Sequence, residues 1–211
     1  STDHVTGIRR PVALAGPANR AGRLVADGIM GRTSHRLPQV TSTAIVRVGE
    51  LTAAMTGANR AALEQAGMSF QTVHLHPLNH AGYFPGASQL NLLVHFGEDG
   101  HVLGAQVVGR DGVDKRIDVL SVAIKAGFTV YDLVDLDLAY SPPYGSAKDP
   151  VNMAGMMACN VLDGTLRLWH ADDVDEVLEN CLVLDVRNDK EFVSGHLPGS
   201  LHIPHTELRD R

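Results

Sequence analysis

Residues 89–109 form the pattern that most restricts how this chain can fold. Two apolar runs, QLNLLVHF at 89–96 and HVLGAQVVG at 101–109, stand on either side of the sequence Glu98, Asp99, Gly100. An acidic-Gly turn between two runs of strand-forming residues is a strong signal for an antiparallel β-hairpin. The sequence therefore predicts an antiparallel sheet that contains this hairpin.

Further strands and helices are predicted on both sides of the hairpin. The expected strands are TAIVRVGEL at 43–51 and MSFQTVHLH at 68–76, and the expected helices are NRAALEQAG at 59–67 and GVDKRIDVLSVAIKAG at 112–127. The second helix has Val113, Ile117, Leu120 and Ile124 on one stripe and stops at Gly127. Hairpins with flanking helices favour an α+β fold in which the helices cover one side of the sheet.

The last part of the chain has a different order of elements. An acidic helix at 171–180 is followed by an apolar, buried-looking strand at 181–187, a short helix at 188–196, and a turn with a strand at 197–204. Strand, helix, strand order implies a parallel pair, the start of an α/β domain. We therefore expect three parts: residues 1–36 with one helix, 37–164 with the sheet, and 165–211.

The end of the chain reads as the beginning of one more helix. In HTELRDR, Thr206 is a suitable N-cap and Glu207 would lie in the first turn. Because natural domains rarely stop one turn into a helix, we expect these residues to be a piece of a longer polypeptide.

Composition narrows the classes of function. The 211 residues carry a net charge of −6 without a run of lysine or arginine, which argues against nucleic acid as a partner. No apolar stretch approaches the roughly 18 residues of a membrane span, and the start lacks the apolar core of a secretion signal. With only two cysteines, a reducing cytoplasm is the expected compartment.

Several nucleotide and catalytic motifs are absent from these residues. No two glycines are separated by a single residue, so there is no G-x-G dinucleotide fingerprint. Neither a Walker A loop, a C-x-x-C pair nor a G-x-S-x-G turn occurs. If the protein binds a nucleotide, its main phosphate-binding site is therefore expected to lie outside these 211 residues.

The histidines and cysteines are candidate site residues. His74 and His76 share a strand face and His80 follows, but no acidic residue or cysteine completes a metal set, so a solvated strand face is expected. Cys159 lies among small residues of a helix and Cys181 starts an apolar strand. Neither position has the cationic, accessible surroundings of a reactive thiolate, so both are expected to be buried and structural.

The loop AYSPPYGSAKDPVN at 139–152 is the most unusual segment. Asp149 is a good N-cap and Pro150 suits the first helical position, so a helix of small residues should start there. Two adjacent prolines favour an extended, stiff loop that fixes Tyr140 and Tyr144. Two interpretations stay open: a packed interface loop without chemistry, or a loop whose tyrosines face a ligand pocket, often in a partner subunit.

Three segments together resemble a known family. HAGYFPGA at 80–87, GAQVVGRDGVDKRIDVL at 104–120 and AYSPPYGSAKDPVNMAGMMACN at 139–160 are similar to the dimerisation domain of the coenzyme A-disulfide reductases. These are FAD-dependent pyridine nucleotide-disulfide oxidoreductases, and they include NADH oxidases and persulfide reductases. PVALAGPANRAGRLVADGI at 11–29 resembles the last helix of the family's FAD domain, and LVLDVRNDKEFVSGHLPGSLHIP at 182–204 resembles the first half of a rhodanese domain.

The resemblance implies roles for particular residues. Tyr83 and Tyr140 would reach across a homodimer to assist at the reactive cysteine of the partner, with Tyr144 a weaker candidate. FAD would be contacted by the start of the first helix, at Leu14, Ala15 and Gly16. In the rhodanese-like segment, Asp185, Arg187 and His196 are expected to fix loops.

The resemblance also implies cofactors and substrates. The parent protein would use FAD, NAD(P)H and coenzyme A, without a metal, and would reduce coenzyme A disulfide, coenzyme A persulfide, polysulfide or oxygen. The redox cysteine, the nucleotide-binding loops and the rhodanese cysteine of the family are not among these residues. We therefore expect the chain to supply a dimer interface and part of a site, and to be inactive alone. The alternatives are a stand-alone dimerisation or binding module with a degenerate rhodanese tail, which natural start and stop codons at these ends would favour, and a plain sulfurtransferase.

Overall fold

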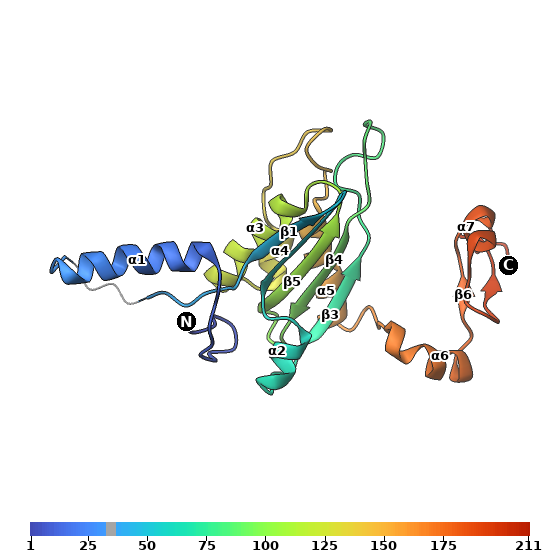
Figure 1. Ribbon diagram of the computed structural model, residues 1–211. Coiled ribbons are helices and arrows are strands. Elements are labelled where there is room, and N and C mark those ends of the chain that lie inside the picture. The colour runs from blue at the N-terminus through green and yellow to red at the C-terminus, as the bar shows by residue number, and fades with distance from the viewer. Residues whose placement is uncertain (33–36) are drawn as a thin grey trace. The chain divides into compact units, whose positions relative to one another are not determined.

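The computed structural model describes residues 1–32 and 37–211, which form two compact units, Ser1–Leu166 and Arg167–Arg211 (Figure 1). The first unit ends at residue 166, where the sequence suggested 164. The described residues of the expected first part, 1–36, lie within this first unit, and residues 33–36 lie outside the described residues. That residues 1–36 are the remnant of a flavin-binding domain stays a prediction.

The centre of the first unit is a five-stranded antiparallel sheet, which confirms the predicted α+β fold. The strand order is β1-β2-β5-β4-β3. The strands are β1 (Ala44–Val48), β2 (Leu51–Gly57), β3 (Gln71–Leu75), β4 (Asn91–Phe96) and β5 (Val102–Gly109). The predicted hairpin joins β4 to β5, with Phe96 opposite Val102 and Gly100 in the left-handed conformation at φ +82°.

The single strand predicted over 43–51 is wrong. The chain reverses after Val48, where Gly49 adopts a φ of +60°, and Leu51 pairs with Val48 as β2 begins. A two-residue reversal of this kind needs a positive φ, which glycine adopts without steric cost. The sequence LTAAMTG was not predicted as a strand because its small residues carry little β propensity.

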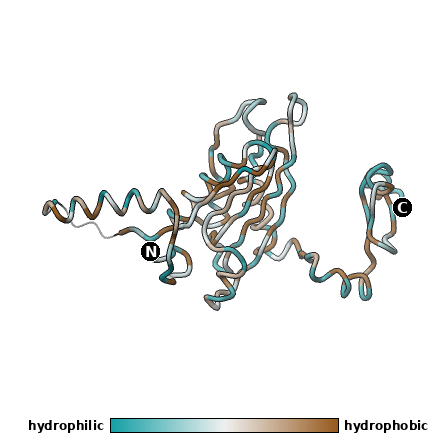
Figure 2. The backbone as a smooth tube through the Cα atoms, in the orientation of Figure 1, coloured by the Kyte–Doolittle hydropathy of each residue, from teal (hydrophilic) through white to brown (hydrophobic). Residues whose placement is uncertain are grey.

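Helices cover one face of this sheet (Figure 1). They are α3 (Val113–Ala126), which packs on β2 and β5, and α5 (Pro150–Leu162), which packs on β3 and β4, with α4 (Val130–Val134) against α5. The short helix α2 (Arg60–Gln65) lies at one end of the sheet, between β2 and β3 in the chain. The core lies between the two layers and includes Leu92, Val94, Val107, Leu120 and Ala154, each at most 2% exposed. Figure 2 shows the strands and the helices behind them mostly in the hydrophobic colour.

The ends of the two long helices are as predicted. The stripe of α3 is buried, and the helix stops at Gly127 in the left-handed conformation, whose N–H bonds back to the last turn. At the start of α5 the side chain of Asp149 accepts from Val151 N at 3.1 Å, with Pro150 in the first turn. Cys159 on α5 is buried as predicted, and burial raises the pKa of its thiol.

The short helix α4 was not predicted from the sequence. Thr129 caps it in a capping box with Asp132, and its C-terminal carbonyls are satisfied from α5. The buried amide of Asn152 donates to the carbonyl oxygens of Leu133, Val134 and Leu136 at 3.0–3.2 Å. One side chain of α5 therefore closes the end of α4 and the beginning of the following loop.

The N-terminal segment packs against the sheet unit. Thr2 and Arg9 pair as a bridge, and the buried carboxylate of Asp3 binds Arg10 at 2.7 Å. The helix α1 (Ala15–Ile29) follows, as predicted, with Ile29 80% exposed. Among the helices of the described residues, none has both the length and the apolar character needed to cross a bilayer.

The second unit contains short elements. They are a 3-10 turn (Ala171–Asp173), α6 (Val174–Asn180), β6 (Leu184–Asp185), α7 (Asp189–Ser194) and β7 (Leu201–His202). β6 and β7 pair in parallel, which confirms the predicted α/β order. The predicted buried strand over 181–187 is wrong: the strand has two residues, and Leu182 is 78% exposed because this small unit supplies little to cover it. Cys181 is exposed, so its predicted burial is wrong as well.

Two further expectations concern this unit. Residues 205–210 form successive turns closed by bonds such as Glu207 N to Pro204 O, so the helix predicted from Thr206 is wrong. Asp185 binds the Arg187 guanidinium, which holds the pKa of that carboxyl near 2, and Arg187 also donates to Gly195 O at 2.8 Å. His196 Nδ1 lies 3.0 Å from Phe192 O. These are contacts that fix loops.

Candidate functional site: a pair of tyrosines at one end of the sheet

Two loops leave the same end of the sheet and lie side by side (Figure 1). The first loop, residues 76–90, connects β3 to β4, and the second loop, residues 135–149, connects α4 to α5. Ala81 N in the first loop donates to Gly145 O in the second at 2.9 Å. The sequence-predicted tyrosines all lie on these two loops.

The first loop is closed at its base and turned at its tip. Asn79 N donates to Ser88 O at 2.9 Å, and Ser88 N donates to Asn79 Oδ1 at 2.8 Å. Beyond this closure, Phe84 N donates to Ala81 O at 2.9 Å. Tyr83 lies in this terminal turn and is 77% exposed.

The second loop contains a hydrogen-bonded turn at its two prolines. Tyr144 N donates to Ser141 O at 2.8 Å, and Gly145 N donates to the same oxygen at 3.1 Å. The extended path expected for this segment is therefore wrong, although the fixed φ of the prolines still stiffens the turn. The turn leaves Tyr144 72% exposed and Tyr140 49% exposed.

The structure brings two of the three predicted tyrosines together. The hydroxyl oxygens of Tyr83 and Tyr140 lie 3.2 Å apart, although the residues are 57 positions apart in the chain. The hydrogen bond to Tyr140 is the main cause that raises the pKa of Tyr83 above its ordinary value of 10.0. We call these two residues the tyrosine pair; Tyr144 lies close in sequence but is not bonded to it in the described part of the chain.

The tyrosine pair can donate hydrogen bonds outward. Because one hydroxyl donates to the other, the second hydroxyl keeps its own proton for an external acceptor. A raised pKa keeps Tyr83 neutral, and so a donor, throughout the physiological range. Hydrogen bonds to an anion such as a thiolate or a leaving sulfur are stronger than those between neutral groups. The pair is thus suited to stabilise negative charge on sulfur or oxygen.

The Tyr140→Phe substitution is expected to lower the pKa of Tyr83 toward 10.0, because it removes the hydrogen bond that favours the protonated phenol. The folded-state pKa of Tyr83 lies above the unfolded value, so this contribution to stability is present at lower pH and is lost as pH rises through the folded pKa. Fluorine NMR of protein labelled with 3-fluorotyrosine would follow each of the four tyrosines through a pH titration. A Tyr83 titration unchanged by the substitution would contradict the bond.

The residues predicted to contact a flavin lie at the start of α1. Leu14 is the N-cap, and the first intrahelical bond runs from Ala18 N to Leu14 O. Pro17 has no N–H, so Ala15 N and Gly16 N are the donors that the helix leaves free at this end. They border an open pocket of about 400 Å³ that Arg20, Thr43 and Ser121 also line. Free donors of a 15-residue helix beside a pocket suit an anionic or electron-rich ring edge.

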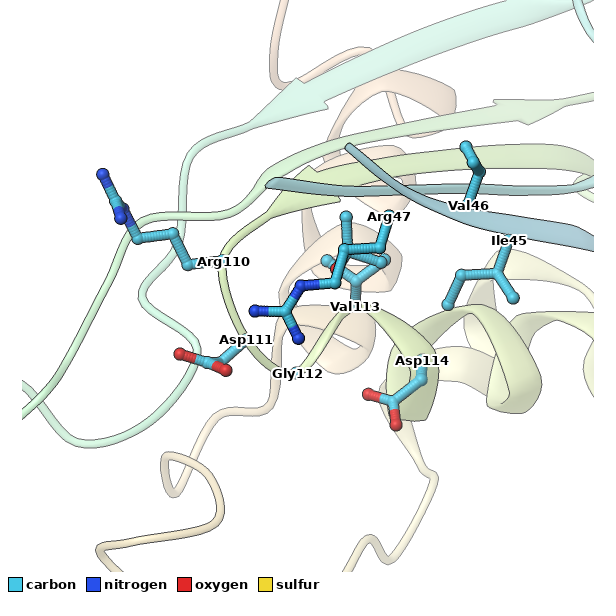
Figure 3. A pocket seen from close by; sticks show the side chains of 9 residues that line it. Ile45, Val46, Arg47, Arg110, Asp111, Gly112, Val113 and Asp114 are labelled. Atoms are coloured by element: carbon cyan, nitrogen blue, oxygen red, sulfur yellow. The ribbon is translucent and has the colours of Figure 1, made fainter. Parts of the chain in front are cut away.

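A second open pocket of about 340 Å³ lies at the N-terminal end of α3 (Figure 3). Arg110, which pairs with Glu50, points away from the first turn of α3, while Arg47 donates to Gly49 O. Asp111 and Asp114 also line it, so charges of both signs meet there. This pocket contains none of the sequence-predicted site residues and does not select a ligand charge.

The histidines are arranged largely as expected. His74 and His76 are exposed on β3 or just after it, whereas His80 is buried, with Nδ1 3.1 Å from Ala81 O. In the described part of the chain, no group of three or more histidine, cysteine or acidic side chains is placed to hold a metal ion.

Arg116 was not predicted from the sequence as part of the site. This arginine is on α3, is 1% exposed and binds both loops of the site. The signal was available: position 116 is three residues after Val113 and four before Leu120, on the apolar stripe of the helix. A charged residue on such a stripe must find partners in the interior, and its position therefore marks a buried ion pair.

Residues 43–150 match the family described as pyridine nucleotide-disulphide oxidoreductase, dimerisation domain, and residues 170–211 match the rhodanese-like domain. The coenzyme A disulfide reductase of Staphylococcus haemolyticus is 36% identical over 159 residues, which is 75% of this chain and 36% of that protein. The same enzyme of a bovine Staphylococcus aureus strain is 37% identical over 161 residues.

Two solved structures cover this chain completely. The reduced CoADR-RHD of Bacillus anthracis has a TM-score of 0.93 at 44% identity, and the NAD-dependent persulfide reductase of A. fulgidus has a TM-score of 0.92 at 37% identity. The chain covers 38% of each of these proteins. It thus spans little more than a third of the length of the relatives that it matches.

Proposed function

The chain belongs to the pyridine nucleotide-disulphide oxidoreductase family through its dimerisation domain, with a rhodanese-like region after it, and we propose that it is the dimerisation portion of a disulfide or persulfide reductase. The reaction would transfer two electrons from NAD(P)H, with a proton, to a disulfide or persulfide and release two thiols or a thiol and hydrogen sulfide. Coenzyme A disulfide, coenzyme A persulfide and polysulfide are the proposed acceptors. The relatives named coenzyme A disulfide reductase and persulfide reductase support this choice.

The tyrosine pair carries the proposal. In a homodimer, Tyr83 and Tyr140 of one subunit would reach the reactive sulfur in the active site of the partner. The hydroxyl whose proton is not used within the pair would donate a hydrogen bond to the thiolate that leaves when the acceptor's sulfur–sulfur bond breaks, and this stabilises negative charge where it develops. The mutual bond at 3.2 Å and the exposure of both rings support a role toward something outside this chain.

The start of α1 is the proposed contact with FAD. Leu14, Ala15 and Gly16 would hold the flavin edge through the two free backbone donors of the first turn. FAD, when bound, supplies the two-electron transfer between NAD(P)H and sulfur. The residues of this chain contribute binding and orientation, because a backbone donor at a helix start needs no rearrangement to meet a negative ring edge.

We also propose that the 211 residues do not catalyse the reaction alone. Cys159 is buried in α5, where burial raises the pKa of its thiol, so it is a poor nucleophile. Cys181 belongs to the second unit. The proposed compartment is a reducing cytoplasm, because the chain has only two cysteines.

A chimera tests this function. Residues 1–211 would replace the matching 38% of the Bacillus anthracis protein, which keeps its own flavin- and nucleotide-binding domains. The expected product is a yellow homodimer that oxidises NADH in the presence of coenzyme A disulfide. Tyr83→Phe or Tyr140→Phe should lower kcat about tenfold, or about 1.4 kcal/mol, with flavin content unchanged.

Tyr131→Phe is the matched control for these variants. Tyr131 is 47% exposed and donates to Asp163 at 2.8 Å, and it belongs to neither loop of the site. Its loss should leave kcat unchanged. The unfused chain should have a mass in light scattering of twice 22.6 kDa and no NADH-dependent turnover. A monomeric, flavin-free or inactive chimera would contradict the proposed function.

A further inference from the structure

We propose that Lys115 and Arg116, two consecutive cations in the first turn of α3, position the tyrosine pair by holding both of its loops at the same time. This role rests on the proposed function of the pair, because the positions of the two loops affect the reaction only if the spacing of the two phenols does. In this role neither cation touches a substrate or a cofactor. Both act through the loops.

Arg116 joins the base of the first loop to the end of the second. Its Nη2 donates to Asn79 O at 2.8 Å and to Asp149 Oδ2 at 3.0 Å, and its Nη1 donates to Gly112 O at 3.2 Å. Asn79 closes the first loop, and Asp149 ends the second loop as the N-cap of α5. A planar guanidinium with several fixed donors can hold such separate acceptors in one geometry, which an ammonium group cannot.

Burial makes this junction specific. Arg116 is 1% exposed and Asp149 is 4% exposed, so water does not replace either partner when a loop shifts. Each displacement of the first loop would leave a buried donor without its acceptor, which is unfavourable. The base of the first loop therefore stays at a fixed distance from the start of α5.

Lys115 holds the second loop immediately before Tyr140. Its Nζ donates to Ala139 O at 3.0 Å, immediately before Tyr140 in the chain, and lies 3.5 Å from Asp149 Oδ2. Residues 139 and 149, on the two sides of the proline turn of the second loop, thus meet one carboxylate and two neighbouring cations. Since Lys115 is about one-third exposed, it can be replaced without leaving a hole in the core.

The bond within the tyrosine pair depends on this arrangement. The loops come from different pairs of elements, and they are joined directly by Ala81 N to Gly145 O and by the phenols themselves. A hydrogen bond between hydroxyls weakens beyond its usual separation, so a shift of less than one ångström at Tyr140 is enough to break a contact of 3.2 Å. Lys115 and Arg116 fix the separation of the two loops, and with it the distance between the two hydroxyls.

The test measures the coupling between the two phenols, in the chain labelled with 3-fluorotyrosine. The pKa of Tyr83 is compared with and without Tyr140→Phe, first in the wild-type background and then with Lys115→Met. We expect Tyr140→Phe to lower the pKa of Tyr83 in the first background and to have little or no effect in the second. The charge of Lys115 acts on Tyr83 whether or not Tyr140 is present, so its direct effect cancels when the two pKa shifts are compared. If Lys115 contributed to stability alone, the shift caused by Tyr140→Phe would be the same in both backgrounds.

Lys125→Met is the matched control. Lys125 lies in the last turn of the same helix, and its Nζ also donates to a backbone oxygen, Gln39 O, at 3.3 Å. It touches neither loop, so the coupling should stay at its wild-type value. Arg116→Lys, which keeps the charge but loses the fork, is expected to behave like Lys115→Met. If that variant does not fold, Lys115→Met decides the question by itself.

An unchanged coupling in folded Lys115→Met protein would overturn the positioning role. The phenol titration does not require flavin, NADH or a sulfur acceptor. A failure here therefore leaves the proposed reductase function intact, and a failure of the chimera assay leaves the positioning result intact.

Discussion

Replacing Asp149 by alanine is expected to destabilise the first unit by about 3–5 kcal/mol, because the Arg116 guanidinium would remain charged and buried without its partner. Arg116 and Asp149 bind at 3.0 Å, and their side chains are 1% and 5% exposed. The substitution also removes the side-chain acceptor that caps α5, which contributes about 1 kcal/mol by itself. Urea unfolding followed by far-ultraviolet circular dichroism measures the loss.

Two further variants separate the charge from the cap. Asp149→Asn keeps a good N-cap but loses the negative charge, so it should retain part of the stability that Asp149→Ala loses. Arg110→Ala is the control for ion pairs in general, since Arg110 and Glu50 form an exposed pair that should contribute about 0–1 kcal/mol. If Asp149→Ala proved no worse than Arg110→Ala, the buried pair would not hold α3 to α5.

Asp149 shows what the sequence could reveal and what it could not. The capping role follows from DPVN alone, because an acidic residue before a proline starts a helix by local geometry. Its pairing with Arg116 joins positions 33 residues apart, and no local rule predicts which distant cation meets it. The sequence of α3 indicates only that Arg116 falls on the buried stripe.

The same limit applies to the sheet. The β4–β5 hairpin and the end of α3 at Gly127 were predictable because glycine and a periodic apolar pattern act over a few residues. The β1–β2 reversal was missed because Gly49 and Glu50 interrupt an otherwise continuous strand pattern without an Asn-Gly or Asp-Gly signal. The α4 helix has only five residues, too few for a helical period to appear.

The candidate site was predicted in part. Resemblance to the family selected Tyr83 and Tyr140 one by one, and the stiffness of the second loop followed from its prolines. The contact between the two hydroxyls depends on how β3, β4, α4 and α5 bring two loops to one end of the sheet. Such a contact is a property of the tertiary structure, since 57 residues separate its partners.

The second large loss of stability is expected where α4 packs against α5. A side chain at Gly155 would place its Cβ 2.8 Å from Val130 O and 2.9 Å from both Leu133 Cβ and Val134 N. Two of these atoms belong to the backbone of α4 and cannot move aside as a flexible side chain would. Gly155→Ala is therefore expected to destabilise the first unit by about 2–3 kcal/mol in urea unfolding, although alanine favours a helix more than glycine does.

Gly28→Ala is the control for Gly155→Ala. Gly28 lies within α1, and a Cβ there meets nothing within 4 Å. The substitution should leave the unfolding midpoint unchanged or raise it slightly, because helix propensity alone acts there, by about 0.5–1 kcal/mol. Equal effects at the two positions would mean that Gly155 is not a point of close approach. We expect the two substitutions to change the free energy of unfolding in opposite directions. That result would show that α4 and α5 can cross closely only because residue 155 has no side chain. The second loop, which connects these helices and contains Tyr140, depends on the same crossing.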